Sequence, residues 1–367
     1  MRGVRNHFDL IVAGAGIAGI TSVAAAASRG LKVALVSTGP GSFVLGAGCV
    51  EVQDAQRGLH SLDEALSFFR NLTEHAGCGF RGGLEEVRYL PTILGSFQTV
   101  SLAPYCMWNG APEAAAQVAV VGIKGLSSFD CNFVAERLAY HASKLGHGSS
   151  YVAREIELSI AEGTVAGTLQ FGNRFDRDPL FYKELFEALK PIAAKATLII
   201  MPGILGLKSD QEKIGSMEKE LGCLLCELPT LPPSIPGMRL FNRLEMWLRR
   251  CGVEFFTGFP IQKLQIENGR CAGVLLETPA RPLRLSAESV ILATGPFSGR
   301  LLGTSAFSVN SDLRPVDSSG ALIAGNLYAA GAILRNSSAR GGNAMAILTG
   351  YAAGMLAAGA GVQYAQR

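Results

Sequence analysis

The chain has 367 residues, of which 48% are hydrophobic and 17% are charged, and its formal net charge is +3. This balance excludes an intrinsically disordered chain, which would be rich in charge and poor in apolar residues. The basic residues are scattered along the chain, which argues against a nucleic-acid-binding surface.

The first predicted elements form a strand–turn–helix–strand unit. A strand is expected over Phe8–Ala13, an alanine-rich helix ends at Arg29-Gly30, and a second strand follows in "LKVALVS". A basic residue followed by glycine is a typical helix end. The unit has the length of a βαβ nucleotide-binding motif. No signal-peptide pattern precedes it, so a cytoplasmic location is expected.

The turn of this unit carries the spacing G-x-G-x-x-G at Gly14, Gly16 and Gly19. Such glycines permit a tight turn, close approach of a pyrophosphate to backbone N–H groups, and close packing of helix on strand. The motif is weak evidence alone, but here it follows a strand and opens a helix. Cofactor contacts are therefore expected at Gly14, Gly16, Ile17, Ala18 and Gly19.

The end of the second strand lacks the usual adenosine anchor. A dinucleotide site commonly has an acidic residue there to bind the ribose, whereas this chain has Ser37 and Thr38. These hydroxyls are expected to contact the cofactor without supplying a charge. The pattern fits a mononucleotide such as FMN, or an FAD that is held by other means.

A glycine-rich loop comes next, and Gly46, Ala47 and Gly48 are expected to contact the cofactor. A helix is predicted over Ser61–Glu74, with Ser61 as its N-cap and Glu64 completing a capping box. Residues 77–116 combine glycine, proline and short apolar runs, which is typical of the strands and turns of an inserted sheet.

The middle of the chain contains "QVAVVGI", a helix over 129–145, and the buried strand in "ATLIIMPGILGL". A proline-dense loop then leads into an amphipathic helix. Its four arginines are interpreted as a surface or subunit-contact face: Arg239, Arg243, Arg249 and Arg250.

From Val253 the pattern becomes rich in β-strands, with a hairpin expected around Asn268-Gly269. Two later strands end in small residues, which let the backbone approach a cofactor closely. A final helix begins with glycine, and a helix N-terminus of this kind is a typical anion-binding site. The predicted contacts there are Ala293, Thr294, Gly295, Gly331, Gly341, Gly342 and Asn343.

The segment 341–366 carries no charge and is long enough to span a bilayer. Its high content of alanine and glycine nevertheless favours a buried helix over a transmembrane one. The expected organisation is discontinuous. A Rossmann-like nucleotide-binding domain, which the resemblance described below implies is flavin-binding, comprises residues 1–75 and 251–367, and residues 76–250 form an inserted substrate or partner domain.

The eight cysteines do not suggest a disulfide framework or a four-cysteine iron–sulfur site, and no metal site is expected. Cys223 and Cys226 have the C-x-x-C spacing of redox or metal sites. Because their surroundings are apolar and no second such pair is near, two core thiols are the favoured interpretation.

The glycine motifs at both ends of the chain resemble those of the two-dinucleotide-binding flavoprotein superfamily. Inside the chain, "VVGIKGLSSFD", "LIIMPGILGL", "LPTLPPSIPGMRLFNRL" and "VILATGPFSGR" are together similar to the B subunit of anaerobic glycerol-3-phosphate dehydrogenase. The resemblance runs from Phe8 to about Ala358 and is weakest between 50 and 115. It implies an α/β fold, with a Rossmann-like (FAD/NAD(P)-binding type) flavoprotein lobe and an inserted mixed α/β lobe.

The same resemblance implies FMN as the usual flavin, with FAD as the alternative. It implies two partner subunits, a catalytic A subunit and a membrane-anchoring iron–sulfur C subunit. Through these partners the chain would lie peripherally on the inner membrane. The complex would oxidise sn-glycerol 3-phosphate to dihydroxyacetone phosphate and pass electrons to the quinone pool.

The sequence offers no convincing catalytic base. The histidines at 7, 60, 75, 141 and 147 lie outside the glycine motifs and are expected at the surface. The candidates for holding substrate phosphate or a reduced flavin are Arg314, Arg335 and Arg340, each equally compatible with a solvated arginine. An electron-relay or assembly subunit, or a stand-alone flavin oxidoreductase with another substrate, remains an alternative.

Overall fold

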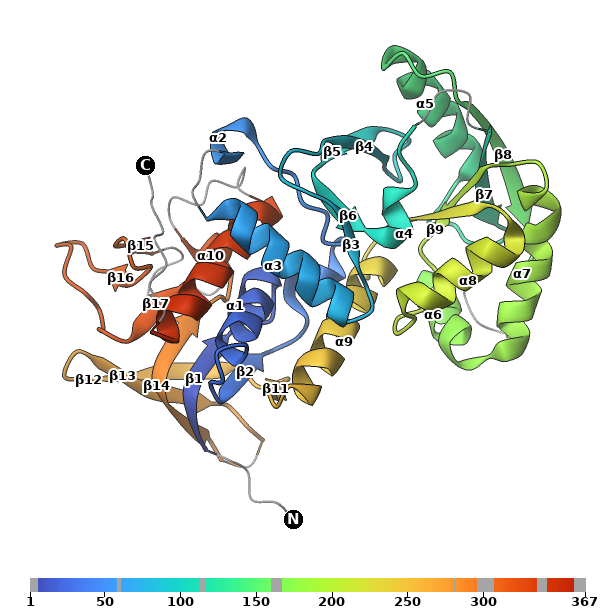
Figure 1. Ribbon diagram of the computed structural model, residues 1–367. Helices are drawn as coiled ribbons and strands as arrows, with labels where there is room; N and C mark the ends of the chain where they lie inside the picture. The colour runs from blue at the N-terminus through green and yellow to red at the C-terminus, as the bar shows by residue number, and fades with distance from the viewer. Residues whose placement is uncertain are drawn as a thin grey trace. The chain divides into compact units, whose positions relative to one another are not determined.

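The computed structural model describes residues 6–57, 61–112, 117–159, 167–279, 281–295, 307–334 and 342–359. The chain divides into two compact units (Figure 1). Unit 1 comprises Met1–Ser42, Glu51–Leu72 and Leu244–Arg367, and unit 2 comprises Phe43–Val50 and Thr73–Arg243. An α/β fold with a Rossmann-like lobe and a second, inserted α/β lobe is confirmed.

Unit 1 is built on a sheet that has seven strands in the described residues, in the order β11-β2-β1-β14-β13-β12, with β17 also paired to β14. The strands are β1 (His7–Ala13), β2 (Val33–Ser37), β11 (Glu254–Thr257), β12 (Ile261–Glu267), β13 (Arg270–Leu276), β14 (Leu283–Leu292) and β17 (Leu327–Ala329). The strands β11, β2, β1, β14 and β17 run parallel, so their carboxyl ends lie at one edge.

The remaining elements of unit 1 are mostly helical. They are α1 (Ile17–Ala27), α2 (Asp54–Arg57), the short strands β15 (Ser308–Val309) and β16 (Pro315–Val316), and α10 (Gly342–Ala357). Two helices are shared with unit 2 along the chain, α3 (Leu62–His75) and α9 (Ile235–Arg250). The predicted hairpin is confirmed, because β12 and β13 pair antiparallel and Asn268 and Gly269 both have positive φ, at 49° and 70°.

Helices α1 and α10 lie side by side against the sheet (Figure 1). Gly350 and Gly354 allow this close approach: a Cβ atom would lie 2.4 Å from the Ala18 carbonyl oxygen at Gly350, and 2.5 Å from the Ser22 carbonyl oxygen at Gly354. The uncharged helix predicted near the C-terminus is therefore a buried helix, as expected. No helix in the described parts of the chain is long and apolar enough to cross a membrane.

Unit 2 contains a parallel sheet of four strands in the described residues, in the order β10-β9-β7-β8. Its strands and helices are β7 (Gln117–Ile123), α5 (Cys131–Lys144), β8 (Ser150–Ile156), α6 (Thr168–Arg177), α7 (Pro179–Ala193), β9 (Leu198–Pro202), α8 (Gln211–Leu221) and β10 (Leu224–Leu228). Helices cover this sheet, and apolar side chains from both form one core. The helix predicted over 129–145 is α5.

The segment 77–116 does not form the single inserted sheet that its sequence suggested. Its described residues, 77–112, contain two separate antiparallel pairs and a short helix: β3 (Phe80–Gly82) with β6 (Leu102–Pro104), β4 (Arg88–Pro91) with β5 (Phe97–Val100), and α4 (Tyr105–Trp108). The strands are only three or four residues long, and β6 makes one further isolated bridge, from Leu102 to Val50. Turns every few residues explain this, since they leave no run long enough for a wider sheet.

Candidate functional site

The carboxyl edge of the parallel strands in unit 1 forms the candidate site. The chain leaves β1 at Gly14, β14 at Ala293 and β17 at Ala330, and β2 ends at Ser37. The strand order changes direction between β1 and β14, because β2 lies on one side of β1 and β14 on the other. In open α/β sheets, ligands bind outside the carboxyl ends of strands at such a switch point.

The turn after β1 is too tightly packed for a side chain at Gly14 or Gly19. It also leaves the first backbone N–H groups of α1 without a side-chain cap. Gly14 has a φ of 110°, and a Cβ atom there would lie 2.3 Å from the Ala293 carbonyl oxygen; at Gly19 it would lie 1.9 Å from the Gly14 carbonyl oxygen. Gly16 is the N-cap of α1 and supplies no side-chain hydrogen bond. The first N–H groups of α1, at Ile17 and Ala18, therefore lack a side-chain cap, as an anion-binding terminus requires.

Two buried hydroxyl groups flank this turn without a hydrogen-bond partner among the described residues. They are the Oγ of Ser37, at the end of β2, and the Oγ1 of Thr294, just after β14. Ser37 is 8% exposed. A buried polar group without a partner costs free energy, so these two hydroxyls are candidates for contacts to a ligand. A bound ligand with ribose or phosphate oxygens would satisfy both hydroxyls.

Space at the same edge is left by two glycines. Gly295 has a φ of 72° and Gly342 a φ of 50°, and a Cβ atom at either would meet no atom of the described residues within 4 Å. At Gly331 a Cβ atom would lie 2.7 Å from the Ala18 Cβ atom, so this glycine is required by packing against α1. Its N–H group donates to Thr349 Oγ1 on α10, at 2.8 Å.

The other predicted contacts are placed as follows. Thr38 follows β2 and Asn343 lies in the first turn of α10. Gly46, Ala47 and Gly48 belong to unit 2, in the segment 43–50 whose Val50 pairs with Leu102. Arg335, Arg340 and Gly341 lie outside the described residues.

Arg314 lies near the carboxyl end of β17. The carbonyl oxygen of the preceding residue, Leu313, accepts a hydrogen bond from the Ala329 N–H at 2.9 Å. The Arg314 guanidinium carbon lies 5.5 Å from the centroid of the Tyr328 ring, and its buried Nε has no hydrogen-bond partner among the described residues. A cation held by an aromatic face, with one N–H group unused, is suited to binding an anion.

Sequence inspection missed two contributors to this edge. Tyr328 supports Arg314, and Thr349 accepts the Gly331 N–H. The four-residue spacing of Gly350 and Gly354 is a detectable signal for the α1 contact, because it places two residues without side chains on one helix face. No sequence pattern around Tyr328 predicts its role, because that role depends on the packing of β16 and β17.

The surface face predicted for the arginines of α9 holds for Arg249 and Arg250, which are exposed, and is wrong for Arg239 and Arg243. Arg239 is 4% exposed and pairs with Glu227, and Arg243 donates to the Ala76 carbonyl oxygen. Arg249 bonds to Glu245 one turn earlier in the helix. The amphipathic pattern was misleading because a distant carboxylate neutralises Arg239 inside the core.

Cys223 and Cys226 are buried free thiols, as expected. Cys226 lies inside β10 and Cys223 immediately before it, and residues three apart along a strand point to opposite faces. Burial raises the pKa of Cys223 to about 11 and that of Cys226 well above its usual value. Such protonated thiols are poor nucleophiles. No cluster of three or more metal-binding side chains occurs within the described ranges.

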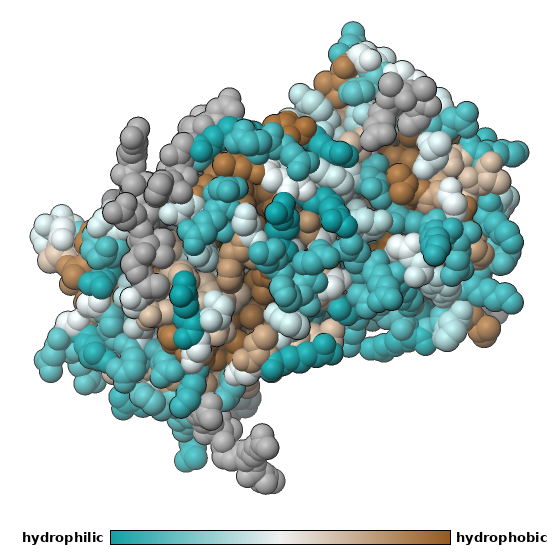
Figure 2. Space-filling view, viewed as in Figure 1, coloured by the Kyte–Doolittle hydropathy of each residue, from teal (hydrophilic) through white to brown (hydrophobic). Residues whose placement is uncertain are grey.

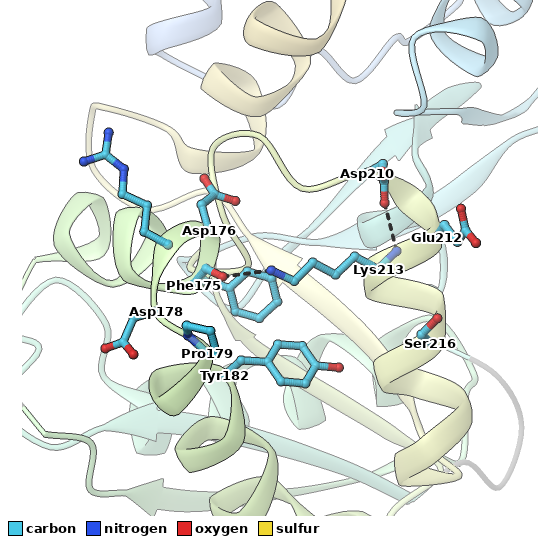
Figure 3. A pocket seen from close by; sticks show the side chains of 10 residues that line it. Phe175, Asp176, Asp178, Pro179, Tyr182, Asp210, Glu212, Lys213 and Ser216 are labelled. Carbon is cyan, nitrogen blue, oxygen red and sulfur yellow. Dashed lines mark hydrogen bonds between the residues drawn. The ribbon is translucent and has the colours of Figure 1, made fainter.

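A separate cavity of about 490 Å³ lies in unit 2 (Figure 3). Lys213 reaches across it from α8, and its Nζ donates to the Phe175 carbonyl oxygen at 2.9 Å. Asp176 accepts the N–H groups of Leu207 and Lys208, and Asp178 caps α7. These carboxylates hold loop and helix ends, so the cavity is explained by the fold and we assign no ligand to it.

Comparison with known proteins identifies the family of this chain. The family described as "FAD binding domain" matches residues 44–249 and 240–309. The B subunit of anaerobic glycerol-3-phosphate dehydrogenase from Actinobacillus pleuropneumoniae serotype 5b (strain L20) is 23% identical over 334 residues, covering 79% of this chain and 75% of the relative. The probable B subunit of the same enzyme from Halobacterium salinarum (strain ATCC 29341 / DSM 671 / R1) is 25% identical over 426 residues, covering 95% and 97%.

The expected resemblance to the B subunit is thereby confirmed. Among solved structures, glycine oxidase from Bacillus cereus ATCC 14579 is a distant match, with a TM-score of 0.33 and 15% identity over 81% of this chain and 59% of its own. The family match supports a flavin cofactor. It gives no support to FMN, the flavin that the resemblance implied.

Proposed function

This chain belongs to the FAD binding domain family, and from that premise we propose that it is a flavin-dependent oxidoreductase that holds FAD at the carboxyl edge of the unit 1 sheet. The observation that carries the proposal is the pair of buried hydroxyls, on Ser37 and Thr294, that lack partners on either side of the glycine turn. The residues present at this edge fit a flavin nucleotide.

Each part of this edge has a role in the proposal. The uncapped start of α1, at Gly16 and Ile17, binds the pyrophosphate through backbone N–H groups. The hydroxyls of Ser37 and Thr38 bind the adenosine ribose, in place of the usual carboxylate. Thr294 and the open space at Gly295 receive another part of the cofactor. When bound, the flavin supplies a two-electron acceptor.

The substrate class follows from the relatives named as the B subunit of anaerobic glycerol-3-phosphate dehydrogenase. We propose oxidation of sn-glycerol 3-phosphate to dihydroxyacetone phosphate, with electrons delivered to quinone through the A and C subunits of the complex. Removing hydride and a proton from a secondary alcohol requires a held phosphate and a proton acceptor. Arg314 is the described residue proposed to hold the phosphate, or the negative charge of the reduced cofactor.

An electron-relay role in the same complex is the second candidate function. It is favoured by the placement of the four described histidines: His7 begins β1 at the opposite edge of the sheet, His75 ends α3, and His141 and His147 lie in unit 2. None is therefore an evident proton acceptor for the alcohol. In this alternative, another subunit oxidises the substrate.

The cofactor assignment is tested by releasing the bound chromophore from the purified chain and measuring its mass. One FAD per chain is expected. FMN in its place would refute the adenosine role of Ser37 and Thr38, and a colourless protein that takes up no flavin would refute the oxidoreductase proposal.

The reaction is tested by adding sn-glycerol 3-phosphate anaerobically to the flavin-loaded chain. Bleaching of the flavin band by substrate alone supports direct oxidation. Bleaching only after the catalytic A subunit is added supports the relay. No bleaching under either condition would leave a flavoprotein with another substrate and refute the glycerol 3-phosphate assignment.

A further inference from the structure

Helix α5 in unit 2 carries an exposed stripe of aromatic and basic side chains. Phe133 is 48% exposed and Tyr140 is 53% exposed, and Arg137 and Lys144 are also exposed. Successive spacings of four, three and four residues place these four side chains on one face of the helix. Hydrophobic and hydrophilic surfaces are accordingly interspersed over α5 (Figure 2).

The stripe is ordered before any partner binds. The Arg137 guanidinium carbon lies 5.7 Å from the Tyr140 ring centroid and the Lys144 Nζ lies 5.5 Å from it. Arg137 Nη2 is 2.9 Å from His141 Nε2. Aromatic and arginine side chains that are held in place lose little conformational entropy on binding, which is typical of interface anchors.

Apolar surface extends the stripe beyond the helix. Leu94, in the turn between β4 and β5, is 68% exposed. A Cβ atom at the next residue, Gly95, would lie 2.2 Å from the Arg137 Cβ atom, so this turn contacts α5. The opposite face of α5 is anchored in the core by Val134 and Leu138. The helix is therefore a fixed platform whose exposed stripe is bordered at Arg137 by the β4–β5 turn.

Charge is distributed unevenly along α5. The acidic residues are Asp130, at the N-cap, and Glu136, and the basic residues Arg137 and Lys144 follow them toward the C-terminal end. Glu136 and Arg137 are midway between Phe133 and Tyr140. A second α5 in antiparallel orientation, related by a two-fold axis at this midpoint, therefore meets opposite charges and equivalent aromatic residues.

We propose that α5 is a self-association surface that takes a second copy of this chain. The two-fold pairing places Glu136 of each copy opposite Arg137 of the other, and Phe133 opposite Tyr140, so every contact occurs twice. Lys144 then lies near Asp130 at the start of the opposite helix. This surface is self-complementary, whereas a parallel pairing would place like charges together.

The four side chains of the stripe offer a smaller contact area than a standard stable interface. The dimer is therefore expected to dissociate at about micromolar concentration. Sedimentation equilibrium of the full flavin-loaded chain over a range of concentrations tests this directly. A concentration-dependent shift from monomer to dimer is expected. A monomer throughout, up to about a hundred times that concentration, would overturn the proposal.

Charge reversal identifies the surface. Glu136→Lys and Arg137→Glu should each weaken self-association at least about tenfold, because like charges then face each other. An equimolar mixture of the two single variants should form a one-to-one heterodimer. The double variant E136K/R137E should dimerise again, since the charges are exchanged in both copies.

A matched control is Glu187→Lys on the exposed face of α7, which should leave self-association unchanged. Thermal midpoints and flavin content should be unchanged in every variant, which separates this proposal from the cofactor site in unit 1. Dimers that are insensitive to both single reversals, or a mixture that fails to associate, would show that α5 is not the contact. Association with a different protein of the complex but not with a second copy would likewise overturn it.

Discussion

Arg239 and Glu227 form a doubly hydrogen-bonded ion pair inside unit 2. Arg239 Nη1 lies 2.6 Å from Glu227 Oε2, and Nη2 lies 3.1 Å from Oε1. Glu227 Oε1 also accepts the Ile204 and Leu205 N–H groups, and Arg239 Nε donates to the Gly206 carbonyl oxygen. Burial lowers the pKa of Arg239, but Glu227 together with Cys106 and Asp176 outweighs burial, and the pKa is raised overall. The pair joins α9 to the loop after β9.

Removing one partner of this pair should be more damaging than removing both. Glu227→Leu should lower the free energy of unfolding by about 3–5 kcal/mol, because Arg239 is left charged and buried. The double variant E227L/R239M should recover the part of this loss that comes from the unpaired Arg239 charge, while the Ile204 and Leu205 N–H groups stay without Glu227 in both variants. Urea unfolding of the three proteins measures it, and equal losses in the single and double variants would contradict the argument.

Ser37→Ala separates cofactor binding from stability. The Ser37 hydroxyl is buried and has no partner in the described structure, so its removal should leave the free energy of unfolding of the cofactor-free chain unchanged or slightly higher. FAD affinity should fall roughly 3–10-fold through loss of about one hydrogen bond. Fluorescence titration measures it, and Thr38→Ala, next along the chain, is the comparison. Undiminished FAD affinity in Ser37→Ala would count against the ribose contact.

Gly350→Ala should disturb the α1–α10 contact. The new Cβ atom would lie 2.4 Å from the Ala18 carbonyl oxygen, so the helices must separate. We expect a loss of about 1–3 kcal/mol in the free energy of unfolding, together with weaker flavin binding because the start of α1 moves.

The matched control is Gly215→Ala on α8, where a Cβ atom would meet nothing within 4 Å. This substitution should stabilise the chain by about 0.5–1 kcal/mol through helix propensity alone. Similar effects from the two substitutions would show that the α1–α10 approach is not limited by these glycines.

Tyr351 should make stability depend on alkaline pH. Its hydroxyl donates to Glu64 Oε1 at 2.5 Å, and burial, with this hydrogen bond, raises its pKa to about 12. In the unfolded chain the pKa of tyrosine is about 10. The folded pKa is the higher one, so the Tyr351 contribution is fully present below about pH 10 and is lost as the pH rises toward the folded value.

Tyr351→Phe removes this dependence. At neutral pH it should cost about 0.5–1.5 kcal/mol, the net value of one hydrogen bond. Its deficit relative to the unsubstituted chain should shrink between about pH 10 and 12. Chemical denaturation at several pH values measures the difference, and a deficit that stays constant over this range would contradict the assigned hydrogen bond.

Arg314 should act through its charge and its geometry. Arg314→Met should raise the KM for sn-glycerol 3-phosphate about 10–100-fold if the guanidinium holds the phosphate, because a charged hydrogen bond is lost. Arg314→Lys should restore only part of the affinity, since lysine lacks the planar fork. An unchanged KM with a lowered flavin reduction potential would instead assign Arg314 to the reduced cofactor.

Much of unit 1 was accessible from sequence because its signals are local. The glycine turn after β1 follows from the strand and helix on either side of it, and Asn268-Gly269 identifies the β12–β13 hairpin from turn chemistry alone. Helix α10 follows from an uncharged run rich in small residues. Each of these features depends on residues within one or two turns of chain, where backbone sterics and side-chain period decide the outcome.

Tertiary structure decided what depends on distant neighbours. It brought Ser37 and Thr294 to the same edge from strands on either side of β1, and it left both hydroxyls without a described partner. It also buried Arg239, which the helical pattern placed on the surface, because Glu227 enters the core from β10 to meet it. The sequence by itself determined the βαβ unit, the β12–β13 hairpin and the uncharged helix α10. The burial of a charge or a hydroxyl depends on which group lies opposite, and only the packing of separate elements sets that.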